Sequence, residues 1–192
     1  MLVGWVSCVI DGNRRTCNAR MLTCLLFERE GGNNGTTVTA GILANRRSLS
    51  WETREGSRSV DYYGSLVMAS TVNLGTTKAG NDVKLPLHSL VPMAHPNDLV
   101  IGGWDISHMG LAAAMDRAKV LDLTLKSLVR KEMAGMRPLP SIYYPDFIAA
   151  NQEDRADNII AGTKACIDHV QHIRKDIREF KAANGLDRLI VL

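Results

Sequence analysis

The sequence lacks the features that mark several specialised classes of protein. No apolar run reaches the roughly 18–20 residues of a membrane-spanning helix. The chain has four cysteines in 192 residues and no C-x-x-C pair, which argues against a disulfide scaffold. Its net charge is only +3, and the basic residues are scattered rather than gathered with aromatic residues. We therefore expect no membrane span, no nucleic-acid partner and a cytoplasmic location.

A metal site is also not expected. His169 and His172 lie three residues apart on a predicted helix, but no cysteine or carboxylate set has a matching spacing. We interpret both histidines as solvated helix residues. The composition that remains, 45% apolar and 22% charged residues, is that of an ordinary globular protein with one sizeable core.

A glycine–asparagine run precedes a predicted helix. Residues 31–37 read Gly-Gly-Asn-Asn-Gly-Thr-Thr, and the helix is predicted over residues 38–46. Glycines let the backbone approach a ligand closely, and the start of a helix attracts phosphate. The run therefore favours a dinucleotide-binding turn, although its spacing is not a plain G-x-G-x-x-G. Taken alone, it fits an Asn-Gly turn without a ligand equally well.

An apolar run that ends in an acid is the second feature. Residues 99–104 are predicted to form a strand, and Asp105 follows at its carboxyl end. In doubly wound folds an acid at this place accepts hydrogen bonds from ribose hydroxyls, usually about 20 residues after the glycine turn. Here the interval is far longer, which requires an excursion between the two strands. By sequence logic Asp105 fits the N-terminal turn of the following helix equally well.

The remaining pattern predicts an α/β fold. We expect the end of a buried strand at 1–3, a loop at 51–61, hairpin strands at 70–74 and 82–85, helices at 111–133 and 163–184, and a strand at 189–192. Gly185 stands where a glycine that ends a helix belongs. The predicted fold is a Rossmann-like, doubly wound, mostly parallel sheet, incomplete and with a β-hairpin excursion, over residues 1–192.

Several longer stretches occur in series and together point to one family. They are Tyr-Tyr-Gly-Ser-Leu (62–66), Leu-Val-Pro-Met (90–93), Pro-Asn-Asp-Leu-Val (96–100), Gly-Trp-Asp-Ile-Ser (103–107), Pro-Ser-Ile-Tyr (140–143), Phe-Ile-Ala-Ala-Asn-Gln (147–152) and Ile-Arg-Lys-Asp-Ile-Arg (173–178). Over residues 31–192, and also 1–5, the chain resembles eukaryotic myo-inositol-1-phosphate synthase, also called inositol-3-phosphate synthase.

The resemblance implies an activity and a cofactor. Members of the family convert D-glucose 6-phosphate to 1D-myo-inositol 3-phosphate, a step of inositol and phospholipid biosynthesis, with a tightly held NAD. Oxidation at C5 is followed by enolisation, an aldol closure between C6 and C1, and return of the hydride. Cationic groups can stabilise the enolate and the oxyanion that form on this route.

The resemblance also implies where NAD binds. By their match to the family's motifs, the cofactor-binding residues are expected to be Gly31, Gly32, Asn33, Asn34, Asp105, Ser141, Ile142, Gln152 and Arg155. Asp105 falls at the adenosine ribose, since the family carries the same excursion between glycine turn and acid. No residue matches a catalytic lysine of the family, so we assign no catalytic residue.

The chain departs from the family between its first strand and the glycine turn. Residues 6–30 separate Gly4-Trp5 from Gly31, where the family's strand runs directly into the glycines. Val6-Ser7 can be encoded by GTGAGT, which resembles a splice donor, and Glu30 by GAG, which ends like an acceptor. We interpret residues 6–30 as a non-family insertion, a retained in-frame intron or an error of the gene model. The rival interpretation is a regulatory insertion whose three cysteines respond to redox state.

Both ends are expected to be short relative to the family, which would remove the catalytic lysines and the substrate phosphate site. We therefore expect a fragment of the synthase that is inactive alone. The alternative is a non-catalytic splice-variant subunit that binds NAD and modulates the full-length enzyme. Expected protein partners are a second copy or a full-length synthase subunit.

Overall fold

A four-stranded parallel sheet forms the centre of the protein. In a computed structural model, residues 23–27, 31–91, 93–146, 152–160 and 166–191 are described, and structural statements below concern these. The strands are β1 (Thr23–Phe27), β6 (Val100–Asp105), β7 (Leu139–Pro140) and β8 (Arg188–Val191). Their order is β7-β6-β1-β8, and each neighbouring pair is parallel. The carboxyl ends of β6 and β1 therefore meet at one edge, where ligands bind in open α/β sheets.

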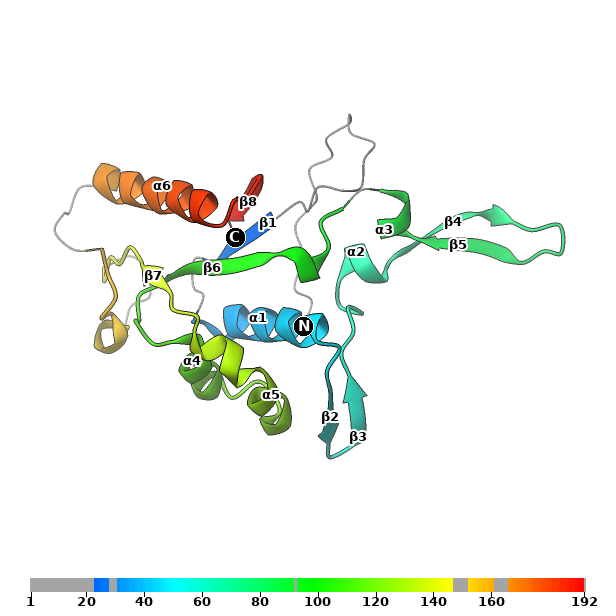
Figure 1. The fold of residues 1–192 in the computed structure, drawn as a ribbon, viewed down its shortest axis with the longest axis horizontal. Helices are drawn as coiled ribbons and strands as arrows, with labels where there is room; N and C mark the ends of the chain where they lie inside the picture. Colours follow the sequence, from blue (N-terminus) through cyan, green and yellow to red (C-terminus); the bar gives the residue numbers. More distant parts are fainter. Residues whose placement is uncertain (1–22, 28–30, 92, 147–151, 161–165, 192) are drawn as a thin grey trace.

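Helices cover both faces of this sheet (Figure 1). The helices α1 (Asn33–Arg46), α4 (Leu111–Ala118) and α5 (Leu123–Ala134) pack on one face, and α6 (Cys166–Ala183) packs on the other. A parallel sheet covered by helices on both faces is a doubly wound fold. The predicted Rossmann-like fold is confirmed.

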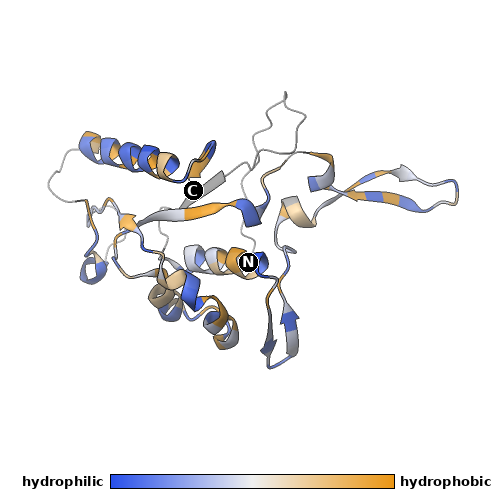
Figure 2. Ribbon diagram, in the orientation of Figure 1, coloured by the Kyte–Doolittle hydropathy of each residue, from blue (hydrophilic) through white to orange (hydrophobic). Residues whose placement is uncertain are grey.

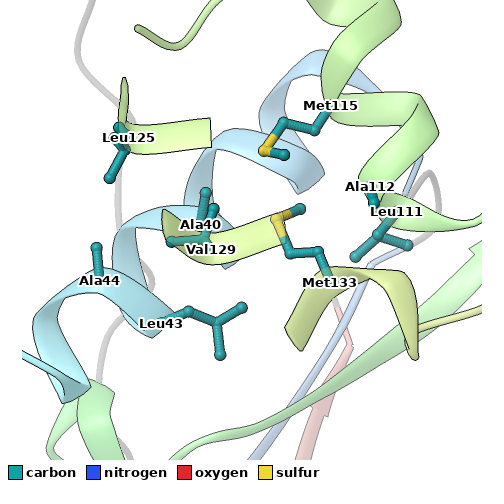
Figure 3. Close-up of a cluster of buried hydrophobic side chains, with 9 residues drawn as sticks. All are labelled: Ala40, Leu43, Ala44, Leu111, Ala112, Met115, Leu125, Val129 and Met133. Atoms are coloured by element: carbon teal, nitrogen blue, oxygen red, sulfur yellow. The ribbon is translucent and has the colours of Figure 1, made fainter. Parts of the chain in front are cut away.

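The main hydrophobic core joins α1, α4 and α5 (Figure 3). Its buried members are Ala40, Leu43, Ala44, Leu111, Ala112, Met115, Leu125, Val129 and Met133. On the other face, Trp104 and Leu186 pack against apolar residues of α6. Figure 2 shows α6 alternating between hydrophobic and hydrophilic bands, as expected for a helix with one face on a sheet. The two cores fix α1 and β6, the elements that carry the candidate site.

Two hairpins lie outside the central sheet. The excursion between glycine turn and acid contains β4 (Thr71–Thr76) and β5 (Asp82–Pro86), which pair antiparallel and extend away from the body (Figure 1). This confirms the predicted hairpin. The predicted loop at 51–61 is wrong, because β2 (Ser50–Thr53) and β3 (Gly56–Ser59) pair there around Gly56, whose φ is +119°. The short helical elements are α2 (Leu66–Ala69), α3 (Leu87–Leu90), η1 (Pro96–Asp98) and η2 (Glu153–Arg155).

The C-terminal elements and the helix over 111–133 can be compared directly with the prediction. The final strand is confirmed in β8, and Gly185 has the positive φ, +60°, of a residue that ends a helix. The single helix predicted over 111–133 is wrong. Lys119 adopts the left-handed conformation with φ +53°, which divides it into α4 and α5. An apolar stripe shows which residues face a core but does not show a one-residue break.

His169 also differs from its prediction. Only 4% of the residue is exposed, and its Nδ1 lies 2.6 Å from the hydroxyl of Tyr144. The interpretation of His169 as a solvated helix residue is therefore wrong, because Tyr144 reaches it from the segment that follows β7. His172 is partly exposed, and its Nε2 lies 3.7 Å from Asp176.

The strand before the glycine turn is formed by residues that we expected to belong to an insertion. β1 lies between β6 and β8, with Phe27 opposite Gly103. The expected insertion at 6–30 is therefore corrected at residues 23–27, which supply the central strand. Residues 1–3, to which we had assigned this strand, lie outside the described residues, as do 6–22 and 28–30.

No described helix combines the length and apolar character that crossing a bilayer requires.

Candidate functional site

The start of α1 offers backbone N–H groups without a side-chain cap. Gly32 is the N-cap residue, with φ −73° and ψ 169°, and it has no side chain to accept from the first turn. That turn also contains no acidic residue. The hydroxyls of Thr36 and Thr37 donate back to the carbonyl oxygens of Gly32 and Asn33. The positive end of α1 is therefore available to an anionic ligand.

Asp105, at the end of β6, supports the glycine turn through a hydrogen bond. Its Oδ2 accepts a hydrogen bond of 3.1 Å from the backbone N–H of Gly31. Its Oδ1 accepts from the N–H of Ser107 at 2.9 Å and from Arg155 Nη2 at 3.0 Å. Only 2% of Asp105 is exposed. Three donors around one buried carboxylate fix the turn against β6.

Glycine is favoured at position 31 by this close approach. A Cβ placed on Gly31 would lie 3.0 Å from Asp105 Oδ2 and 3.3 Å from its Cγ. A side chain there would have to push the carboxylate or the turn aside.

Arg155 connects Asp105 to the wall of a cavity. Its Nη1 donates to Gln152 Oε1 at 2.9 Å, while its Nη2 donates to Asp105. Both residues come from the segment around η2, which otherwise has little regular structure. One partly buried arginine thus orders a loop amide and neutralises an acid at a strand end.

Asn158 attaches this loop to the sheet. Its N–H donates to the carbonyl of Ile106, and its side-chain Nδ2 donates to the carbonyl of Asp105, at 2.8 and 2.9 Å. Its own carbonyl accepts from the N–H of Ser141 at 3.0 Å. Asn158 therefore joins the ends of β6 and β7 and places Arg155 beside the glycine turn.

These groups surround a cavity of about 550 Å³, a size typical of small-molecule sites. Its lining residues are Gly32, Asn33, Asn34, Arg117, Gln152 and Arg155. Another cavity, of about 640 Å³, lies beside the β2–β3 hairpin and the start of α5. None of the predicted site residues lines that cavity, so we place the site at the glycine turn.

The structure brings together most of the residues expected to bind the cofactor. Five of the nine line the cavity directly, namely Gly32, Asn33, Asn34, Gln152 and Arg155. Gly31 and Asp105 form its buried support. Ser141 and Ile142 follow β7, and neither lines the cavity. Ser141 reaches the site through Asn158.

Arg117 is the cavity residue that sequence reasoning missed. It lies in the last turn of α4, and its Nη2 donates to the carbonyl of Gly31 at 2.9 Å. Burial lowers the pKa of its guanidinium, and the like charge of Arg155 lowers it further. In the sequence it is one more polar residue on an amphipathic helix, so no spacing signal could have found it.

A second contact holds the loop that contains Arg155, and it predicts that the stability of the protein depends on pH. Asp157 accepts from the N–H of His108 at 2.9 Å, and this bond is the main cause of its lowered pKa. Because the pKa is lower in the folded state, the stabilisation is present above the unfolded pKa of about 4. It is lost as the pH falls through the folded value.

We expect Asp157→Asn to lower the melting temperature at pH 7 and the difference from wild type to shrink as the pH falls below about 4. Thermal unfolding of both proteins across this range measures it. The exposed Asp146→Asn is the control for a change of charge. A difference that persists unchanged at pH 3 would contradict this account of the Asp157 carboxylate.

The parallel sheet, the turn before α1 and the acid at the end of β6 define a Rossmann-like dinucleotide-binding domain. The chain belongs to the myo-inositol-1-phosphate synthase family, because the family's NAD-binding model matches residues 24–192. The cofactor of this domain family is NAD.

Named relatives agree with this assignment. Inositol-3-phosphate synthase of Dictyostelium discoideum is 52% identical over 161 residues, which are 84% of this chain and 31% of the relative. Inositol-3-phosphate synthase 1-A of Xenopus laevis is 57% identical over 162 residues, 84% of this chain and 28% of the relative. The crystal structure of inositol-3-phosphate synthase from Caenorhabditis elegans superposes with a TM-score of 0.84 at 47% identity. The match covers 88% of this chain and 33% of that one. The chain thus spans about a third of the length of these relatives.

Proposed function

We propose that this chain is the NAD-binding part of an inositol-3-phosphate synthase. The proposed reaction is the conversion of D-glucose 6-phosphate to 1D-myo-inositol 3-phosphate, for which NAD held at the glycine turn would supply reversible hydride transfer. The proposed location is the cytoplasm. A full-length synthase subunit or a second copy is the proposed protein partner. No described residue is proposed to be catalytic, and we expect the chain alone to be inactive.

The observation that carries this proposal is the link from the glycine turn to the cavity wall through Asp105. One carboxylate accepts from Gly31 on one side and from Arg155 on the other. The uncapped N–H groups of α1 and two guanidinium groups face the same space, and this donor set fits a pyrophosphate.

The proposed contacts are with the adenosine and pyrophosphate half of NAD. We assign the phosphates to Gly32, Asn33 and Asn34. The adenosine ribose is assigned to the part of the cavity beside Gln152 and Arg155, with Asp105 as the buried anchor of both. Gly31 supports the turn, and Ser141 and Ile142 are assigned to the adenine side beyond the cavity.

Calorimetric titration of the purified chain tests this proposal. We expect NAD to bind at one site, ADP to compete with it, and nicotinamide mononucleotide not to compete. Absence of NAD binding, or competition by the mononucleotide as strong as that by ADP, would contradict it. Formation of inositol phosphate by the chain, free of full-length enzyme, would overturn the expectation that it is inactive alone.

A further inference from the structure

We propose that Arg117 is a phosphate-binding residue of this cavity, with its guanidinium held at the Gly31 carbonyl and facing the start of α1. The inference deepens the proposed function and rests on it. The ligand group is a phosphate of the dinucleotide, bound between Arg117 and the first turn of α1. Neither the sequence pattern nor the resemblance singles out this residue.

The backbone of Gly31 is held from both sides. Asp105 accepts from its N–H at 3.1 Å, and Arg117 donates to its carbonyl at 2.9 Å. Ala114 and Met115, one turn or less before Arg117, are 0% and 1% exposed. Met115 packs with residues of α1 in the main core, so the arginine starts from a rigid position. Its guanidinium is therefore ordered next to the turn before a ligand arrives.

The two arginines of the cavity differ in charge compensation. Arg155 forms an ion pair with Asp105, whereas no ion pair with Arg117 is found among the described residues. The acid and the two arginines therefore leave one net positive charge at the cavity. The positive end of α1 adds to it.

This excess of positive charge is energetically unfavourable, and a bound anion would offset the unfavourable free energy. Burial and the neighbouring Arg155 both disfavour the charged form of Arg117, and its pKa is lowered accordingly. An anion between α1 and the guanidinium groups would offset both effects. A guanidinium forms two parallel hydrogen bonds with a phosphate, which suits Arg117 better to this ligand than to a ribose hydroxyl.

The test separates a phosphate contact from support of the turn. Arg117→Met removes the charge and keeps much of the aliphatic length, whereas Arg117→Lys keeps the charge. Arg178→Met makes the same change at an exposed position of α6, on the opposite face of the sheet. The dissociation constants of NAD, ADP and adenosine are measured by calorimetry for the four proteins, and thermal unfolding monitors the fold.

We expect Arg117→Met to weaken NAD and ADP by about 10- to 100-fold, the range for a charged hydrogen bond. Adenosine binding should change by less than about twofold, because adenosine carries no phosphate. Arg117→Lys should recover most of the ADP affinity, and Arg178→Met should leave all three constants unchanged.

Equal weakening of ADP and adenosine by Arg117→Met would overturn the inference and leave Arg117 as a support of the turn. Unchanged affinity for ADP would also overturn it. If Arg117→Met does not fold, Arg117→Lys provides the test. The inference would then be overturned if Arg117→Lys bound ADP no more tightly, relative to adenosine, than an uncharged contact would allow. Failure of the wild-type chain to bind NAD would instead contradict the proposed function, on which this inference rests.

Discussion

Asp105→Asn is expected to lower both the stability of the protein and its affinity for NAD. The carboxylate accepts from Gly31, Ser107 and Arg155 while it is 2% exposed. An asparagine side chain of the same shape has only one acceptor oxygen. Its NH₂ group would therefore face either the N–H of Gly31 or the donors of Ser107 and Arg155. Arg155 also loses its buried counter-charge. Breaking a fully buried pair costs about 3–5 kcal/mol of unfolding free energy, and we expect a loss at or below this range because the Arg155 side chain is 28% exposed.

The expected loss of NAD affinity is about 100-fold or more, because the turn and Arg155 would both lose their fixed positions. Urea unfolding measures the loss of stability. Calorimetry at a temperature where the variant is folded measures the loss of NAD affinity.

Asp116→Asn is the matched control for Asp105→Asn. Asp116 lies on α4, is paired with Arg130 and Lys126, and its side chain is 36% exposed. Exposed ion pairs contribute up to about 1 kcal/mol, so the control should change stability little. If Asp105→Asn lost NAD affinity at unchanged stability, the acid would act as a direct acceptor for the ribose and not as the anchor of the turn.

Met133→Ala is expected to have the largest effect on stability outside the site. Met133 is 0% exposed and packs among residues of α1 and α4 in the main core (Figure 3). Truncating such a side chain costs about 2–5 kcal/mol, because lost contacts and a residual cavity add together. Urea unfolding at pH 7 measures it. NAD affinity of the folded variant should stay within about threefold, since Met133 does not line the cavity.

Two variants sharpen the Met133 experiment. Met133→Leu keeps the volume and should cost less than about 1.5 kcal/mol. Leu123→Ala lies on the same helix at a position that is 79% exposed and should be nearly neutral. A similar loss in Leu123→Ala and Met133→Ala would contradict core packing as the cause, because alanine itself favours the helix.

Local patterns gave much of the fold correctly. The apolar run over 99–104, the hairpin at 70–85 and the helix before Gly185 are all present, because each depends on neighbouring residues alone. Two of the errors arose where one residue changes the path of the chain. Lys119 divides a predicted helix, and Gly56 turns a predicted loop into the β2–β3 hairpin.

The candidate site, like the fold, could be predicted from the sequence only in part. The glycine turn and the acid at the end of β6 are visible in the sequence, since both are short motifs attached to a strand or a helix. The resemblance to the family added Gln152 and Arg155, which have no local signal of their own. Arg117 came only from the structure.

The sequence by itself therefore determined which segments form the glycine turn, the hairpin and the helices, because side-chain periodicity and glycine positions act over a few residues. Only the tertiary structure shows that Asp105 hydrogen-bonds to Gly31, 74 residues away in the sequence. The same holds for the hydrogen bond between Arg117 and Gly31, which are 86 residues apart. Those contacts depend on how α1, α4 and β6 pack, and packing is a property of the whole core rather than of any short stretch.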